Sequence, residues 1–313
     1  MSLGNRKSRT FIVRIVPAIL LAITVIIAGA NLSAKAQESK SKPQAKSDSS
    51  RDGKIDAQQL ARDVLTNELK AEQSDKTLWR FRKTEWQKGK EQLYDVIETK
   101  HGDVSRLLAE NGKPLNAEQQ RAENARIQKL TNESDEMKKQ VQTLKQDGDQ
   151  ETKLLAMLPD ALLYHYASRK GDLVRLTFKP NPRFHASSHE AEVFHHMSGV
   201  MVLNTKVKRL VELRGRLNSE VKFFGGILGH LNKGGTFAVK QADVAGTHWD
   251  MTLLDTELNG KALFFKTIAV HEKRVESNYQ RVPEDITVEQ AVQMLRKDKT
   301  ESASVPSKKN ATN

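Results

Sequence analysis

Apolar and polar residues alternate with two different periods along the chain, and the longer period predicts helices at both ends of a series of strands. After Asp56, apolar residues recur every three or four positions, which predicts a helix over 57–72. Asp56 and Gln59 have the spacing of a capping box, and Thr287 and Gln290 have the same spacing before a last helix. One helix is therefore expected before the first strand and another after the last strand.

The shorter period predicts strands. Trp79 and Phe81 alternate with arginines, and turn signals at 88–89, 101–103 and 111–112 divide this region into a three-stranded antiparallel meander. Further alternating runs begin near residue 174. In one of them Leu213 and Leu217 face away from Arg214 and Arg216.

Asn259-Gly260 lies between two apolar runs and predicts a two-residue hairpin. Strands that follow one another without intervening helices indicate a large antiparallel sheet that is curled or partly closed. The expected fold class is α+β, a curled antiparallel β-sheet covered by helices, with one long polar helix and disordered termini.

The long polar helix is expected over 116–146. Its apolar stripe has the spacing 3-4-3-4-3 and consists of Ile127, Leu130, Ser134, Met137, Val141 and Leu144. One interpretation is a helix that lies across the sheet. The other is a surface that pairs with a partner helix, which would make it the site of a helix-mediated protein partner.

The two ends of the chain have compositions unlike the middle. A basic start, an apolar run and a small-residue site at 34–36 predict that residues 1–36 are a signal peptide, or an uncleaved membrane anchor if 11–32 are retained. Residues 37–55 are a flexible linker, and 299–313 form a disordered tail. A single α+β domain is expected over 56–298. The protein is expected to be exported to the periplasm or cell envelope.

The charge narrows the class of partner. The 313-residue chain has a net charge of +12, and removal of 1–36 leaves +7 because that segment has five basic and no acidic residues. A moderately basic exported protein meets an anionic membrane surface more readily than nucleic acid. Aromatic residues make up 5% of the chain, too few to indicate a base-stacking surface, so no nucleic-acid partner is expected. The chain has no cysteine, so the fold has no disulfides.

A glycine-rich segment over 225–235 resembles a phosphate-binding loop, but it lacks the features that bind phosphate in such a loop. Lys233 precedes Gly234, and the position that needs the lysine holds Gly235. The residues that follow alternate like a strand, so there is no helix N-terminus to hold a phosphate. The segment is instead expected to be a short apolar helical turn that either completes the core or lines the mouth of an apolar cavity.

The histidine-rich loop near 185–196 departs from the H-E-x-x-H pattern, because Val193 stands where the second histidine belongs. The sequence has neither G-x-S-x-G nor cysteine chemistry, and no pair of carboxylates is singled out. No catalytic residue, metal or cofactor is expected, and the protein is not expected to be an enzyme.

Four pieces of the later sequence, Leu210–Leu213, Gly225–Gly235, His248-Trp249 and "GKALFFKTI", resemble a group of exported bacterial proteins. Their order is similar in outline to the lipoprotein-localisation-factor fold, the LolA/LolB/LppX-like half-barrel. That resemblance implies a curled sheet, closed by helices, that holds acyl chains, and it is an analogy at the level of the fold.

The function expected from this resemblance is a non-enzymatic carrier of a lipid or lipoprotein acyl chain. The candidate ligand-binding residues are Phe223, Phe224, Ile227, Leu228 and Leu231 at the mouth, with Phe264 and Phe265 on the sheet. The alternative is a structural protein of the envelope that pairs through helix 116–146.

Overall fold

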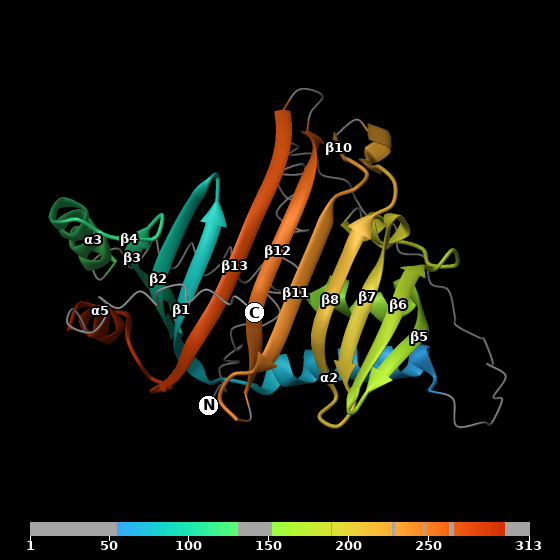
Figure 1. Cartoon of the computed structure of the whole chain (residues 1–313), viewed down its shortest axis with the longest axis horizontal. Coiled ribbons are helices and arrows are strands. Elements are labelled where there is room, and N and C mark those ends of the chain that lie inside the picture. Colours follow the sequence, from blue (N-terminus) through green and yellow to red (C-terminus); the bar gives the residue numbers. More distant parts are fainter. Residues whose placement is uncertain are drawn as a thin grey trace, which may run out of the picture.

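The computed structural model describes residues 55–130, 152–188, 190–226, 229–246, 248–262 and 266–297. Its centre is one open, curled antiparallel sheet of 13 strands in the order β4-β3-β2-β1-β13-β12-β11-β8-β7-β6-β5, with β10 paired to β12 and β9 paired to β10 (Figure 1). The strands are β1 Leu78–Gln87, β2 Lys90–Thr99, β3 Gly102–Glu110, β4 Lys113–Pro114, β5 Leu162–Lys170, β6 Leu173–Pro180, β7 Met197–Asn204, β8 Arg209–Leu217, β9 Val221–Phe223, β10 Gly229–Leu231, β11 Thr236–Asp243, β12 Trp249–Ala262 and β13 Lys266–Val282. The expected curled antiparallel sheet is confirmed.

The predicted meander is present as β1, β2 and β3, paired in sequence order. The turn signals act as expected, because Lys88, Gly89, Asn111 and Gly112 all have the positive φ that tight hairpin turns require. β13 then pairs with β1 and joins the meander to the rest of the sheet.

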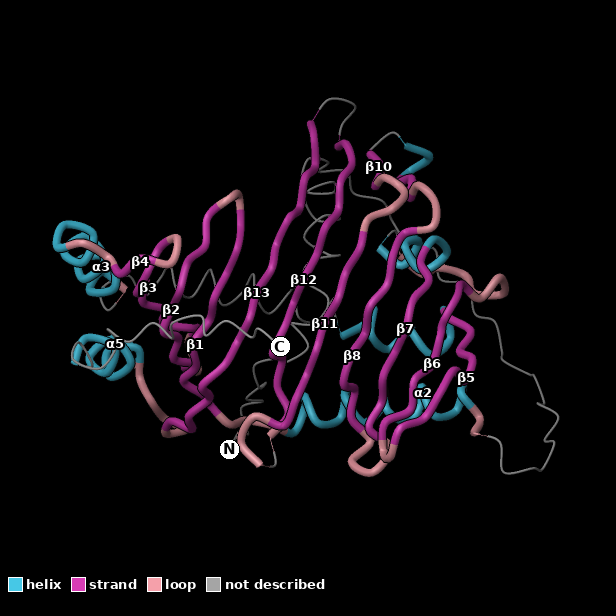
Figure 2. The backbone as a smooth tube through the Cα atoms, viewed as in Figure 1, coloured by secondary structure: helices cyan, strands magenta, loops and turns pink. Residues whose placement is uncertain are grey.

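The described helices are α2 Ala57–Ser74, α3 Ala117–Lys129 and α5 Val288–Lys297, with a further helix over 152–161 and two 3-10 segments, η2 Glu190–His196 and η3 Phe224–Gly226. Of these, α3 and α5 lie at the β1–β3 end of the sheet, and α2 runs behind the strands from β5 toward β12 (Figure 2). α2 packs on β5 and β8, whereas α3 and α5 pack on β2 and β3. No described helix has both the length and the apolar character needed to span a bilayer.

These helices cover opposite faces of the same sheet. Ile268 of β13 belongs to the same core as Val64 and Leu65 of α2, and the cross-strand register places Glu272 and Glu276 on the face of Ile268. Ile97 of β2 lies in the core beneath α3 and α5, and the register through β1 assigns it to the other face. We call the face under α2 the inner face and its reverse the open face. On the open face, α3 and α5 cover only the β1–β3 end.

Polar side chains attach α2 to the sheet along its length. Near its start the Gln58 amide donates to the carbonyls of Pro159 and Leu162. Near its end the buried Glu68 carboxylate accepts hydrogen bonds from Arg209 Nε at 2.9 Å and from the Leu210 amide at 2.6 Å. These hydrogen bonds and the apolar face of α2 together fix the position of the helix on the sheet.

The predicted helix caps are borne out with one difference. Asp56 accepts from the amides of Gln58 and Gln59, but the Gln59 side chain donates to Asp63 and does not return to the cap. The reciprocal capping box forms at α5, between Thr287 and Gln290.

The long polar helix is not shown at its predicted length. α3 covers Ala117–Lys129 and is capped by Asn116 and Gln119, and the predicted continuation to 146 lies outside the described residues. Ile127, the first residue of the predicted stripe, is fully buried against α5 and β3. In the described part, the stripe therefore packs on the protein itself.

The predicted two-residue hairpin at Asn259-Gly260 is wrong. Both residues lie inside β12, which continues to Ala262, and β13 begins at Lys266. Gly260 serves a close approach of strands, since a Cβ there would lie 2.1 Å from the carbonyl oxygen of His230 on β10. A glycine required by packing has the same sequence signal as a glycine required by a turn.

The segments predicted for the chain ends, 1–36 and 299–313, lie outside the described residues, as does the linker 37–55 apart from Ile55. Between them, all the described strands belong to the one sheet.

Candidate functional site

The structure separates the seven residues predicted to bind a ligand. Phe223 and Leu231 lie on β9 and β10 and are fully buried in the inner-face core, beside Val221 and Ala262. Phe224 begins η3, and its side chain is outside the description. Ile227, Leu228, Phe264 and Phe265 lie outside the described residues. The two positions whose side chains are described are thus parts of the core.

The glycine-rich segment contains β10, which pairs with β9 and with β12. Its helical turn covers only Phe224–Gly226, and Leu231 belongs to a strand. Gly229 opposes Ala262, and a Cβ on Gly229 would lie 2.2 Å from the carbonyl oxygen of Lys261. The glycines thus allow β10 to lie close against β12.

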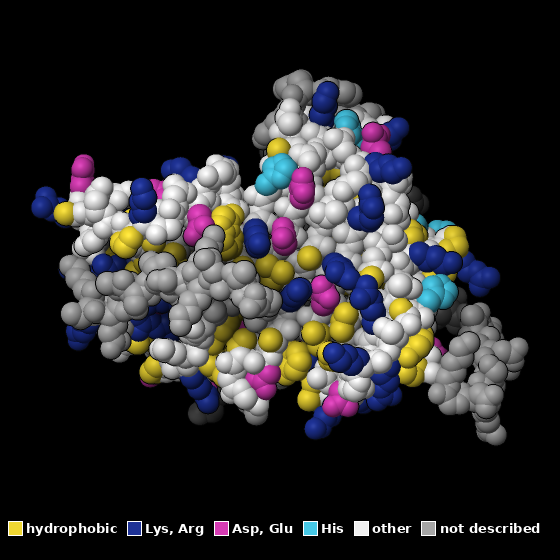
Figure 3. Space-filling view, in the orientation of Figure 1, with side chains coloured by type: hydrophobic (Ala, Val, Ile, Leu, Met, Phe, Trp, Pro, Cys, Tyr) yellow, Lys and Arg dark blue, Asp and Glu magenta, His cyan; other side chains and the backbone are white. Residues whose placement is uncertain are grey.

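The open face of β6, β8 and β11 has a different character, because it is exposed and basic (Figure 3). The strand register places one acidic residue, Glu212, on this surface. The basic residues there are all exposed, and they are Arg175, Lys179, Arg214, Arg216 and Lys240. We call these five residues the basic face.

One cross-strand row shows how this surface is built. Val200, Arg214, Ala238, Asp255 and Lys273 lie side by side on β7, β8, β11, β12 and β13. Neighbouring strands are about 4.8 Å apart, so long charged side chains on β8 and β12 stand about 10 Å apart across a small alanine. The next row repeats the pattern with Arg216, Thr236 and Glu257.

The small residues of β11 leave an open depression of about 500 Å³ between these walls. We call this depression the trough. Its basic wall is Arg214 and Arg216 and its acidic wall is Asp255 and Glu257, and Ser198 and Thr236 also line it.

Gly215 lies between the two arginines, and packing on the inner face requires a glycine at this position. A Cβ on Gly215 would lie 2.6 Å from the ring of Phe237, which is buried beneath it. The opposing Gly199 has the same relation to the ring of Phe178. The rings of Phe178 and Phe237 therefore lie directly beneath Gly199 and Gly215, so that backbone alone, with no Cβ, forms the floor of the trough at these two positions.

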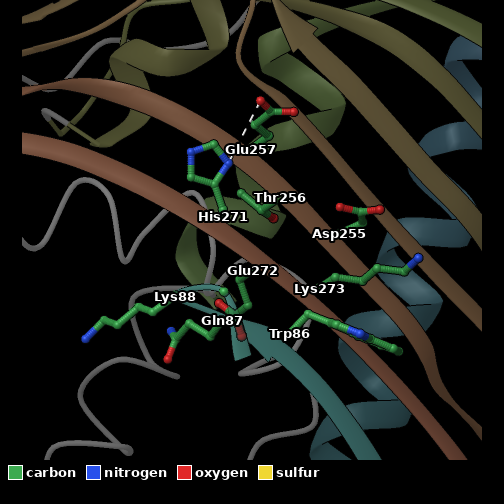
Figure 4. Close-up of a pocket in the computed structure, with 10 residues that line it drawn as sticks. Trp86, Gln87, Lys88, Asp255, Thr256, Glu257, His271, Glu272 and Lys273 are labelled. Carbon is green, nitrogen blue, oxygen red and sulfur yellow. Dashed lines mark ion pairs between the residues drawn. The ribbon is translucent and has the colours of Figure 1, made fainter. Parts of the chain in front are cut away.

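A second pocket of about 220 Å³ adjoins the trough and shares its acidic wall (Figure 4). Here His271 Nδ1 lies 3.9 Å from a carboxylate oxygen of Glu257. The Lys273 ammonium lies 5.4 Å from the centre of the Trp86 ring, at cation–π distance. The acidic wall thus stands between two surfaces that carry basic groups.

Two strongly perturbed titratable groups, His248 and Asp75, lie elsewhere, where α2 meets β12. His248 Nδ1 donates to Asp75 at 2.9 Å, and its Nε2 lies 3.7 Å from the fully buried carboxylate of Asp250. Burial opposes the charged imidazolium, but the two carboxylates outweigh it and raise the pKa of His248 to about 9. Burial acts to raise the pKa of Asp75, but hydrogen bonds from His248 and Thr77 hold it well below its usual range.

This geometry suits a structural ion pair. An imidazolium that stays protonated at neutral pH cannot accept a proton as a general base. The described residues include no group of three or more His, Asp or Glu side chains with metal-binding geometry. His195 and His196 lie in η2, and His189 is outside the description.

Sequence reasoning identified only part of this site. Alternation placed Arg214 and Arg216 on the polar side of a strand, but the trough depends on which strands flank β8, and the sequence does not give that order. Comparisons of the chain with family models, curated proteins and solved structures find no match.

Proposed function

We propose that the protein is a non-enzymatic lipid-binding protein of the cell envelope that docks on anionic phospholipid headgroups through the basic face. The observation that carries the proposal is the set of five exposed basic residues around a single acidic one on β6, β8 and β11. β6, β8 and β11 lie close together in the sheet, with only β7 between β6 and β8, and the register places the five basic side chains on the same face.

The attraction of several basic side chains to an anionic membrane is additive. Each Lys or Arg near an anionic leaflet contributes about 1 kcal/mol of attraction, and the effect falls off within a Debye length of about 8 Å at physiological salt. Basic residues on neighbouring strands of one face can come within that distance of the membrane together. The expected export of the chain and its charge of +7 without residues 1–36 agree with this partner.

The test is cosedimentation of the full chain with vesicles that contain or lack phosphatidylglycerol, at rising salt concentration. Replacement of Arg214→Gln and Arg216→Gln removes two charges, so the salt-sensitive binding is expected to weaken about 30-fold. Both side chains are exposed, and the fold should be unaffected.

The matched control is Lys70→Gln with Lys76→Gln, which removes two exposed charges beside α2, on the other side of the sheet. This control should bind like the wild type. Equal losses in the two variants would mean that net charge alone matters and that the basic face is not the docking surface.

Carriage of an acyl chain is a separate part of the proposal, drawn from the half-barrel analogy. The burial of Phe223 and Leu231 in a packed core argues against a mouth at those two residues. Native mass spectrometry of the protein from an envelope fraction tests for cargo. Adducts with lipid masses would support a carrier, and a clean apoprotein mass would limit the function to docking.

A further inference from the structure

We propose that the trough binds a zwitterionic amino-phosphate headgroup, such as that of phosphatidylethanolamine. The basic wall would hold the phosphate and the acidic wall would hold the primary ammonium. This inference rests on the proposed function, because it names the headgroup that one site takes once the protein lies on a membrane.

The walls have the right charges in the right arrangement. Arg214 and Arg216 stand on β8, and Asp255 and Glu257 stand on β12, with β11 between them. The backbones of β8 and β12 are about 10 Å apart, and the side chains narrow that gap. A ligand with two opposite charges on a short linker fits between walls of this kind.

The two walls do not neutralise each other. Among the described residues, no ion pair within 4 Å joins the basic wall to the acidic wall. The ion pairs that do form are Arg214 with Glu212 of its own strand at 3.8 Å, and Glu257 with His271 of β13, on the side away from the trough, at 3.9 Å. Opposite charges that face an open trough without touching each other are a suitable place for a ligand that bridges them.

The hydroxyl of Thr236 supports the assignment of the phosphate end. Thr236 flanks Arg216 in the register and lines the trough, whereas the hydroxyl of Ser198, on the other neighbouring strand, donates to Asn218 at 3.0 Å. Guanidinium groups and hydroxyls are the side chains that bind phosphate oxygens best.

The acidic wall favours a cationic group over a simple anion. Asp255 and Glu257 would repel a second phosphate, whereas they can accept hydrogen bonds from an ammonium. A primary ammonium has three such donors and a quaternary one has none, so ethanolamine should be preferred to choline.

The experiment compares vesicles with a fixed share of phosphatidylglycerol and either phosphatidylethanolamine or phosphatidylcholine as the remainder. The full chain is expected to bind the ethanolamine vesicles about fivefold more tightly, the scale of one exposed charge pair. Asp255→Asn with Glu257→Gln should abolish this preference and keep the salt-sensitive binding to phosphatidylglycerol. The charge-matched control is Glu220→Gln with Asp285→Asn, two exposed residues outside the trough, which should keep the preference.

Two outcomes separate this inference from the function on which it rests. Failure to bind any anionic vesicle would overturn the proposed function. Binding to phosphatidylglycerol with equal affinity for ethanolamine and choline vesicles would overturn the headgroup site and leave the docking surface standing. Soluble glycerophosphoethanolamine should compete for the preference, and a lack of competition would also count against the site.

Discussion

The imidazole of His248 stacks on the indole of Trp79, with the ring centres 4.3 Å apart and the planes inclined by 26°. Trp79 lies on β1 and His248 precedes β12, so the contact spans β13. Asp75 holds the same imidazole from the end of α2. One residue thus ties the helix on the inner face to two strands of the sheet.

This arrangement predicts how stability depends on pH. The pKa of His248 is raised from 6.5 to about 9, so its contribution is fully present below about pH 6.5 and is lost as pH rises through 9. Urea unfolding at several pH values should therefore show a falling free energy of unfolding between these limits. His248→Gln should flatten that part of the curve. An unchanged slope in the variant would contradict the assignment.

The Glu68 carboxylate predicts an energetic coupling between α2 and β8. Glu68→Gln keeps an acceptor for the Leu210 amide but loses the charge that pairs with Arg209, and we expect a loss of about 1–3 kcal/mol in the free energy of unfolding. Arg209→Met in the same background should cost less than it does alone. Additive losses in this double-mutant cycle would show that the pair is not coupled.

The close approach of β10 and β12 predicts that Gly260 cannot be replaced. Gly260→Ala would place a Cβ 2.1 Å from a backbone oxygen, and we expect a loss of about 1–3 kcal/mol in thermal unfolding. Asn259→Ala, one residue earlier on the same strand, is the control and should cost less. A Gly260→Ala variant as stable as the wild type would mean that β10 does not pair there.

Ile127 is the first residue of the apolar stripe predicted for helix 116–146. Its burial predicts that this residue stabilises the fold. Ile127→Ala should lower the free energy of unfolding by about 2–5 kcal/mol, because it opens a cavity beneath α5. The sedimentation coefficient of the folded protein should stay unchanged. A change of oligomeric state with unchanged stability would instead support the partner helix.

The sequence predicted the strands well where alternation and turn chemistry agree, as in β1–β3, and it predicted both terminal caps. It misassigned Gly260 because local residues cannot tell a turn from a close approach of strands. The Asp75–His248 pair joins residues 173 positions apart, and no local pattern signals such a contact. The trough needed the strand order, in which the acidic residues of β12 lie two strands from the arginines of β8.

We expect the basic face, and not the side that carries α2, to meet the membrane. Because the chain has no cysteine, single labelling sites can be introduced at Thr177→Cys on the open face and at Lys70→Cys on α2. An environment-sensitive fluorophore at each site is then read with phosphatidylglycerol vesicles. We expect a spectral shift and quenching by headgroup-labelled lipid at position 177 and no change at position 70. Quenching at position 70, or at neither position while the protein is bound, would contradict this expectation.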